Sequence, residues 1–296
     1  YLYYYVNIYK YIYNNININK IINHKSLSFH YEIIESIIVK YYEILEIDKN
    51  TPIHIYLSIL DNIIFKNYIS NKYPNIKFEN ISNYDYYINC TIYDKDFDNL
   101  EKNKLNKKYI SHQITERLKQ NKNVYFLTPL AKINFIYTDI LPYSNNKKYT
   151  NIPIYIIQGC LTSGRRNFDL LKKILDNTYD YNFIIKLIGY DYEYSNELQK
   201  YNDKIIIKSN LNFVDYHKEF LDTYCILPLI SKNTHKNYYT NKLTSTINYA
   251  RGYKLKCLID NDLQKIYNLN DVEIYNDIND IVSAFNNTLK SFYSCK

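Results

Sequence analysis

The sequence predicts an α/β protein with one sheet domain in each half of the chain. The second half alternates short apolar segments with helical segments at regular intervals. Its strand candidates are apolar on both faces, as expected for a parallel sheet that helices cover on both sides. The first half repeats this alternation less regularly. We therefore predict a doubly wound α/β domain in the second half and a smaller α/β domain in the first.

The elements of the second half follow from its apolar runs. Runs such as Ile154–Gln158 (IYIIQ) have the length and β-branched content of buried strands. The expected strands are Ile154–Gln158, Phe183–Ile188, Lys204–Lys208, Tyr224–Leu227, Lys256–Ile259 and Val272–Tyr275. The expected helices between and after them are Asn167–Asn177, Glu193–Tyr201, Phe213–Leu221, Lys242–Tyr253, Leu263–Tyr267 and Ile278–Phe292.

In the first half, His30–Leu45 carries apolar residues at the spacing of one helix face. We assign no element to the Ile/Tyr/Asn-rich opening that precedes it. The expected strands are Ile53–Leu57, Ile76–Glu79, Tyr84–Thr91, Lys108–Ser111, Val124–Leu127 and Asn134–Tyr137. The other expected helices are Asp61–Lys72 and Gln113–Gln120.

The polar segment Leu141–Ile152 is the best candidate for a linker between the two domains. It reads LPYSNNKKYTNI, with one proline inside it and a second directly after it. The predicted domains are therefore residues 1–141 and 153–296, joined by a linker at residues 142–152.

The composition limits the classes of function. Ile, Asn, Lys and Tyr dominate, so the 38 tyrosines serve mainly as core residues of a chain with AT-rich codons. The net charge of +7 comes from scattered lysines, and no basic run marks a nucleic-acid interface. No apolar run is long enough to cross a bilayer. The chain begins at Tyr1, so a removed N-terminal segment could still associate it with a membrane.

The cysteines favour a reducing compartment such as the cytoplasm. There are five of them, an odd number, and none are closely spaced. Cys225 and Cys257 lie inside apolar strand candidates and behave as small buried hydrophobic residues. No zinc-binding spacing occurs, and no Asp-x-Asp pair follows a strand, so we predict no metal site.

The turn after the first strand of the second half is a candidate phosphate site. Gly159 and Gly164 allow close backbone approach, and Arg165 and Arg166 stand where the next helix starts. Arginine binds phosphate through charge-assisted hydrogen bonds of about 1.5–3 kcal/mol each. The alternative is that one arginine pairs with Asp169 on the helix surface, a contact of little energetic value. Only two other arginines occur in the chain, which favours a binding role.

A second polar cluster precedes the helix candidate Lys242–Tyr253. Helix starts carry unpaired N–H groups and partial positive charge, which suits an anion. Helix capping explains one polar residue, but not five. The cluster consists of Thr240, Asn241, Lys242, Thr244 and Ser245.

If both clusters lie at the carboxyl ends of strands in one sheet, they converge on a region that could hold a diphosphate. Lys186, in the second strand, is included in this predicted donor site. Leu211, after the third strand, would contact a nucleobase together with the neighbouring Ser209 and Asn210.

These motifs resemble the nucleotide-binding domain of GT-B glycosyltransferases. The resemblance rests on Gly159 followed by Arg166-Asn-Phe-Asp-Leu-Leu, on Gly189 after the next strand, and on the block NKLTSTINYARGYKLKCLID. By pattern it covers Ile154–Phe292. It implies two Rossmann-like domains that face each other across a cleft. It also implies a nucleotide-diphosphate sugar as donor, a glycan, protein or small-molecule hydroxyl as acceptor, and neither a metal nor another cofactor.

The sequence also departs from this family. Cys160 stands where the large retaining group has an arginine, and the two glutamates that flank the region His235–Leu243 in that group are missing. The resemblance therefore implies nucleotide-sugar binding more strongly than any stereochemical course. A catalytically inactive binding module and a nucleotide-sugar epimerase are the alternatives.

A general base should come from the first domain. His112 follows a strand and has a pKa suited to neutral pH, although it could instead cap the helix Gln113–Gln120. Asp61 and Asp85 are alternatives next to other strands. Asp139 is a further candidate, and His30 could contact the acceptor or cap a helix.

Overall fold

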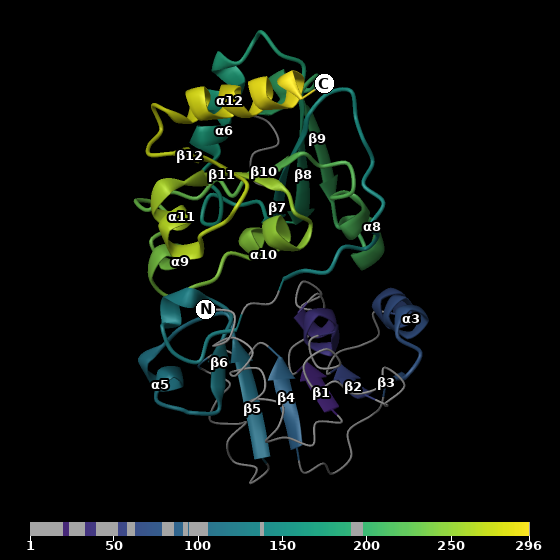
Figure 1. The fold of residues 1–296 in the computed structure, drawn as a ribbon. Helices are drawn as coiled ribbons and strands as arrows, with labels where there is room; N and C mark the ends of the chain where they lie inside the picture. The colour runs from purple at the N-terminus through teal and green to yellow at the C-terminus, as the bar shows by residue number, and fades with distance from the viewer. Residues whose placement is uncertain are drawn as a thin grey trace. The chain divides into compact units, whose positions relative to one another are not determined.

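The computed structural model spans residues 1–296 and describes residues 20–23, 33–39, 53–57, 63–78, 86–90, 94, 106–136, 139–190 and 198–295. The chain forms two compact units (Figure 1). The first consists of Tyr1–Leu141 and Asn241–Leu243, and the second of Pro142–Thr240 and Thr244–Lys296.

The first unit contains a 6-stranded parallel sheet in the order β3-β2-β1-β4-β5-β6. The first described strand, β1, lies in the middle of the sheet. The next two strands follow on one side of it and the last three on the other. This is the strand order of the Rossmann fold. The strands are β1 (Lys20–Asn23), β2 (Ile53–Leu57), β3 (Ile76–Phe78), β4 (Tyr86–Cys90), β5 (Asn106–Ser111) and β6 (Val124–Phe126).

The described helices of this unit are residues 33–39, α3 (Ile63–Lys72), α5 (Glu116–Lys119) and the 3-10 turn η3 (Pro129–Ala131). Leu118 of α5 packs with Tyr109 and Phe126 in a buried cluster. The structure differs from the expectations at two places. No element was expected where β1 lies, and of the strand expected at Asn134–Tyr137 the described residues form only an isolated bridge between Phe135 and Phe126.

The second unit repeats the same topology in a 6-stranded parallel sheet, ordered β12-β11-β10-β7-β8-β9. All six strands predicted for this half overlap the observed ones. They are β7 (Ile154–Cys160), β8 (Ile184–Tyr190), β9 (Ile205–Ser209), β10 (Cys225–Ile226), β11 (Lys256–Asp260) and β12 (Val272–Tyr275). The protein is therefore an α/β protein with parallel sheets, as predicted.

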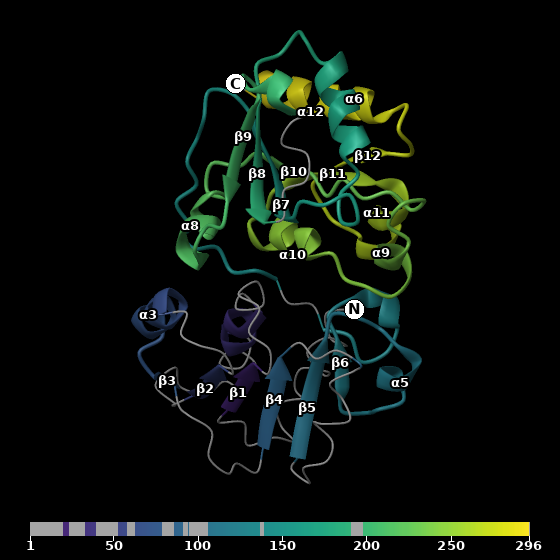
Figure 2. The ribbon, with the colours of Figure 1, turned by 180° about the vertical axis from the view of Figure 1, so that it is seen from behind.

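Helices cover both faces of this sheet. On one face α6 (Phe168–Asn177) and α12 (Ile281–Ser294) lie side by side (Figures 1 and 2) and pack onto Tyr155 and Ile157 of β7. On the other face lie α8 (Phe213–Lys218) and α10 (Ser245–Gly252). The remaining elements are η4 (Gln199–Tyr201), α9 (Asn237–Thr240) and α11 (Asn261–Tyr267).

Aromatic stacking fixes α10 against the segment that follows α8. The Phe220 ring lies 4.6 Å from the ring centroid of Tyr249 and 4.9 Å from that of Tyr253, stacked on both. Since α10 follows β10 and precedes β11, it runs antiparallel to the strands and begins at their carboxyl ends. Among the described residues, no helix combines the length and the apolar character that crossing a membrane requires.

Candidate functional site

Two glycines shape the carboxyl ends of β7 and β8. Gly159 and Gly189 are partners in the register of the two strands, with φ angles of 101° and 155°. A Cβ atom on Gly189 would lie 1.7 Å from the Gly159 carbonyl oxygen, and one on Gly159 would lie 3.2 Å from Nη2 of Arg166. Any side chain at Gly189 would therefore push the strands apart, so the backbone here can be approached closely only because both residues are glycine.

Arg166 is a buried cation beside these glycines. Its side chain, 4% exposed, donates from Nη1 to the Arg165 carbonyl (2.8 Å) and from Nη2 to the Gln158 carbonyl and to Oγ1 of Thr246 (3.3 Å). Its Nε is buried without a hydrogen-bond partner. Within the described part of the chain, no carboxylate pairs with it.

Burial lowers the pKa of the Arg166 guanidinium, but arginine stays protonated in proteins. Among the described residues, this positive charge therefore has no carboxylate as counter-charge. Arg165 lies next to it, half-buried, and donates from Nη1 to the Tyr238 hydroxyl (3.2 Å). Burial alone would lower the pKa of Arg165, but the neighbouring Tyr238 outweighs it and raises that pKa. Asp169, the alternative partner, lies 4.0 Å from Lys172 instead.

The start of α10 adjoins this arginine pair. Its N-cap residue, Thr244, makes no side-chain capping bond. Gln158, near the end of β7, donates from Nε2 to Oγ of Ser245 (3.2 Å) and to Oγ1 of Thr246 (3.0 Å). The first turn of α10 is thereby held at the end of β7, where its N–H groups and partial positive charge lie close to Arg166.

The loop after β10 is tied to the turn that carries the arginines. Asn167 donates from its backbone N–H to the Leu229 carbonyl (2.7 Å) and from Nδ2 to Oγ of Ser231 (3.1 Å). His235 donates from Nε2 to the Ser163 carbonyl (3.0 Å) and accepts at Nδ1 from the Thr234 hydroxyl (2.7 Å). These bonds bridge β7 and β10, where the strand order reverses and where Rossmann-like sheets bind ligands.

Sequence reasoning missed two residues of this region, Gln158 and His235. Burial lowers the pKa of His235, the hydrogen bond to Ser163 opposes this shift, and the charges of Arg166 and Arg165 add to it. His235 is therefore a neutral imidazole that joins two loops. The only hint in the sequence was its place between β10 and α10, in a stretch without acidic residues.

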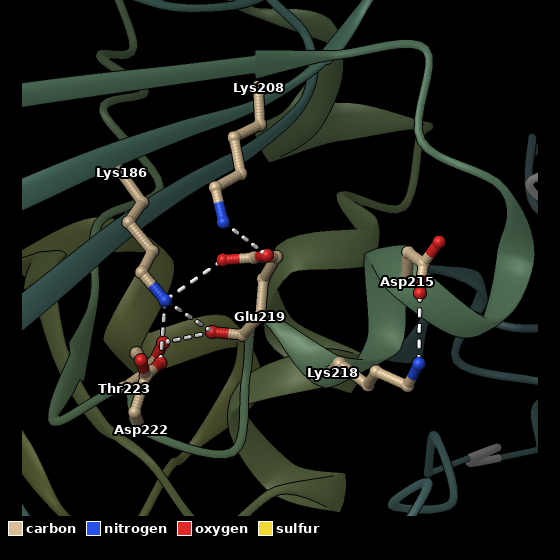
Figure 3. Close-up of polar contacts among 7 residues, drawn as sticks. All are labelled: Lys186, Lys208, Asp215, Lys218, Glu219, Asp222 and Thr223. Atoms are coloured by element: carbon tan, nitrogen blue, oxygen red, sulfur yellow. Dashed lines mark hydrogen bonds and ion pairs between the residues drawn. The ribbon is translucent and has the colours of Figure 1, made fainter.

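Lys186, predicted as a donor-binding residue, is already paired. It lies in the middle of β8, and its Nζ is 2.9 Å from Oε2 of Glu219 and 2.6 Å from Oδ1 of Asp222 (Figure 3). Lys208 of β9 pairs with the other oxygen of Glu219 at 2.6 Å. We name these four residues the α8 ion-pair network. Because two carboxylates engage Lys186, we leave it out of the donor site proposed below.

The structure separates the other predicted donor residues. Thr244 and Ser245 start α10, as described. Thr240 is exposed at the end of α9, while Asn241 and Lys242 belong to the first unit, where the Asn241 carbonyl accepts from the Ile114 N–H (2.7 Å). Helix α10 consequently begins three residues later than predicted. Leu211 follows β9, next to Asn210, whose N–H donates to the Gly189 carbonyl (3.0 Å).

Of the candidate bases, His112 is buried after β5, and its carbonyl accepts from the Leu243 N–H (2.9 Å). It does not cap α5, because Thr115 does so. Asp139 is described, and its backbone carbonyl accepts a hydrogen bond from Oγ of Ser36. Asp61, Asp85 and His30 lie outside the described residues. Among those that are described, no three His, Cys, Asp or Glu side chains gather to hold a metal ion.

Neither a protein-family model nor a curated protein matches the sequence. Solved structures do match its fold. The chain is similar to a glycosyltransferase from Rickettsia africae ESF-5, with a TM-score of 0.56 and 12% identity over 94% of this chain and 89% of that one.

Two further solved structures match the fold with similar TM-scores. One is the apo form of the lipopolysaccharide outer core galactosyltransferase WaaB, with a TM-score of 0.51 and 14% identity over 92% of this chain and 90% of that one. The other is AviGT4, a glycosyltransferase of avilamycin A biosynthesis, with a TM-score of 0.51 and 8% identity over 90% and 87%. This chain has the fold of the GT-B-type glycosyltransferases.

Proposed function

We propose that the protein is a glycosyltransferase whose second unit binds the diphosphate of a nucleotide-diphosphate sugar. The observation that carries this proposal is Arg166, a buried guanidinium without a carboxylate among the described residues, beside the start of α10. A buried charge is costly unless an opposite charge accompanies it. A bound diphosphate would supply that charge, and helix starts are common phosphate sites.

The same groups suit the transfer reaction. When the bond between the anomeric carbon and the phosphate oxygen breaks, negative charge grows on the leaving diphosphate. Arg165, Arg166 and the Ser245 hydroxyl, together with the first N–H groups of α10, would stabilise this charge. The acceptor hydroxyl adds to the anomeric carbon and gives up its proton. His112, Asp61 and Asp85 stay the predicted candidates for the base, and a metal-independent reaction stays a prediction.

The test is thermal unfolding with a panel of nucleoside diphosphates and nucleotide sugars. A ligand at about 100 times its Kd adds ~2.7 kcal/mol of stability, which corresponds to a rise in Tm of roughly 5–10 °C. Stabilisation by one nucleotide sugar, with slow release of its free sugar, is the expected result. No stabilisation by any nucleotide would refute the proposal. Interconversion of free nucleotide sugars would identify an epimerase instead.

A second candidate, a binding module without transferase activity, is favoured by one observation. From Thr223 to Ile259 the sequence contains no Asp or Glu, so the segment that includes the start of α10 offers no carboxylate for catalysis. Nucleotide binding without turnover, in the presence of a panel of hydroxyl acceptors, would support this function. Transfer of labelled sugar to any acceptor would exclude it.

A further inference from the structure

Gln158 is the centre of a buried polar network under the start of α10. Its side chain is 1% exposed, although glutamine is rarely buried so completely. Its Oε1 accepts from the Tyr216 hydroxyl (2.5 Å), and its Nε2 donates to Ser245 (3.2 Å) and Thr246 (3.0 Å). Its backbone carbonyl accepts from Nη2 of Arg166. One residue thus joins the three elements β7, α8 and α10 to the buried guanidinium.

Tyr216 fixes which way the amide points. A phenol O–H donates readily, and the carbonyl end of the amide is an acceptor, so the Tyr216 contact holds Oε1 on the side of α8. Both N–H groups of Nε2 then face α10, where each has an acceptor. All hydrogen-bonding groups of the Gln158 side chain are engaged, which defines a single orientation.

This orientation determines the direction of the Ser245 proton. Because Oγ of Ser245 accepts from Gln158, its own O–H must point away from the amide. Ser245 is an exposed residue, so this O–H can donate to solvent or to a ligand. Thr246 accepts from both Gln158 and Arg166 and is fully buried. Of the two hydroxyls, only that of Ser245 is placed to donate to a ligand.

The amide also leaves the charge of Arg166 in place. A glutamate of the same shape would provide a carboxylate within the network and would balance the guanidinium. A neutral glutamine holds the same helix and the same strand end together without balancing it. The network therefore joins the elements firmly and still leaves a net positive charge for an anion.

We propose that Gln158 is a positioning residue for the donor diphosphate. It directs the Ser245 hydroxyl toward the ligand as a hydrogen-bond donor and, being neutral, adds no counter-charge to Arg166. This inference rests on the proposed function, because it concerns the same anion site.

The substitution that tests it is Gln158→Glu, which changes the chemistry and keeps the shape. A carboxylate can only accept, so Ser245 and Thr246 must turn their protons inward, and Arg166 gains a counter-charge. Tyr216 can still donate to it. We expect unchanged or raised Tm together with a loss of affinity for pyrophosphate and for nucleoside diphosphates. We expect Kd to rise about tenfold to a hundredfold, which is the effect of losing one charge-assisted hydrogen bond.

Two further variants separate positioning from a general effect of charge. Gln199→Glu adds the same charge at the exposed η4. Because η4 precedes β9, it lies at the amino ends of the strands, whereas α10 begins at their carboxyl ends. Its Kd should equal that of the wild type. Ser245→Ala removes an exposed hydroxyl with little effect on folding, and its Kd should rise. In the Gln158→Glu background, Ser245→Ala should have almost no further effect, because the two residues act as one unit.

The measurement is isothermal titration calorimetry with pyrophosphate and with the nucleoside diphosphate that stabilises the wild type most. If the wild type binds and Gln158→Glu binds equally well, this inference is wrong while the proposed function stands. Additive losses in the double variant would also overturn it. If the wild type binds neither probe, both the proposed function and this inference fail. Should Gln158→Glu not fold, an unchanged Kd for Ser245→Ala would still refute the inference.

Discussion

The second unit contains two polar networks that differ in how their buried cation is paired. In the α8 ion-pair network, Lys186 and Lys208 share two carboxylates at 2.6–2.9 Å (Figure 3). In the network around Gln158, Arg166 contacts only carbonyl and hydroxyl oxygens among the described residues. Lys186 and Arg166 are both buried, so burial alone does not distinguish these two cations.

The difference lies in what completes each network. The paired lysines need nothing further: burial opposes ionisation of Glu219, but hydrogen bonds from Lys208 and Lys186 lower the pKa of this carboxyl. That network closes on itself, so removing one member would leave a buried charge unpaired. No carboxylate among the residues that the structure describes balances the charge of Arg166, which favours an anion from outside. A series of matched substitutions to methionine can test this contrast between a cation used for stability and a cation used for binding.

The largest effect is expected for Lys186→Met. It leaves Asp222 without its ammonium and Glu219 with only the half-exposed Lys208. Removing one partner of a buried ion pair costs about 3 kcal/mol, because the remaining charge stays buried. Unfolding in urea should show this loss, while the Kd for a nucleoside diphosphate of the folded protein stays unchanged.

The control for this variant is Lys186→Met combined with Asp222→Asn. Removing the orphaned carboxylate should recover part of the lost stability, since the pair is coupled. A loss below about 1 kcal/mol in the single variant would mean that water already solvates the network. A change in Kd would return Lys186 to the donor site.

Arg166→Met should give the reverse pattern. The methionine fills the space of the side-chain stem and removes the unbalanced charge, while two carbonyls and Thr246 lose their donor. These changes oppose one another, so we expect stability within about 1 kcal/mol of the wild type. The affinity for nucleoside diphosphates should fall about tenfold or more. Equal affinity, or a loss of stability as large as that of Lys186→Met, would remove the contrast between the two networks.

The sequence allowed prediction of the parts of the fold that depend on local pattern. The strands of the second unit are apolar runs bounded by polar residues, and each was located to within a few residues. Strand β1, KIIN, was missed because it lies in an Ile/Tyr/Asn-rich stretch where apolar and polar residues give little contrast. The start of α10 was placed too early because Asn241–Leu243 pairs with another part of the chain.

The site was predictable only where rare residues marked it. Arginine and glycine are scarce in this chain, so Arg165, Arg166 and Gly159 were noticeable. The role of Gln158 depends on residues 58 and 88 positions away, and the partners of Lys186 follow it by 33 and 36 positions. Such contacts are made by the topology of the sheet, and no local spacing reveals them.

A smaller effect, visible only at acidic pH, is expected for His235→Gln. Burial holds the pKa of His235 below the ordinary value of about 6.5 that applies in the unfolded chain. As the pH falls below 6.5, the unfolded state binds a proton that the folded state does not bind, so the wild type loses stability. Gln can still donate to the Ser163 carbonyl and does not titrate. In unfolding curves between pH 7 and pH 5, the variant should therefore lose less stability than the wild type.

An acid response that is identical in both proteins would show that His235 is protonated while folded. That result would also weaken the case for the neighbouring arginines as an anion site. A protonated imidazole could persist beside Arg165 and Arg166 only if some counter-charge compensated all three groups.

The smallest effect is expected for Lys218→Met, which completes the methionine series with a cation of α8. Lys218 lies 2.9 Å from Asp215 one helical turn away, but both side chains are 49% exposed (Figure 3). Water and salt screen such a pair, so we expect no measurable change in the urea midpoint or in nucleotide affinity. A loss comparable to that of Lys186→Met would show that ion pairing along α8, and not burial against β8 and β9, gives the α8 ion-pair network its stability. The buried pair of Lys186 and the exposed pair of Lys218 would then contribute equally to stability. The contrast with Arg166 would have to be explained by where each cation lies on its helix or strand.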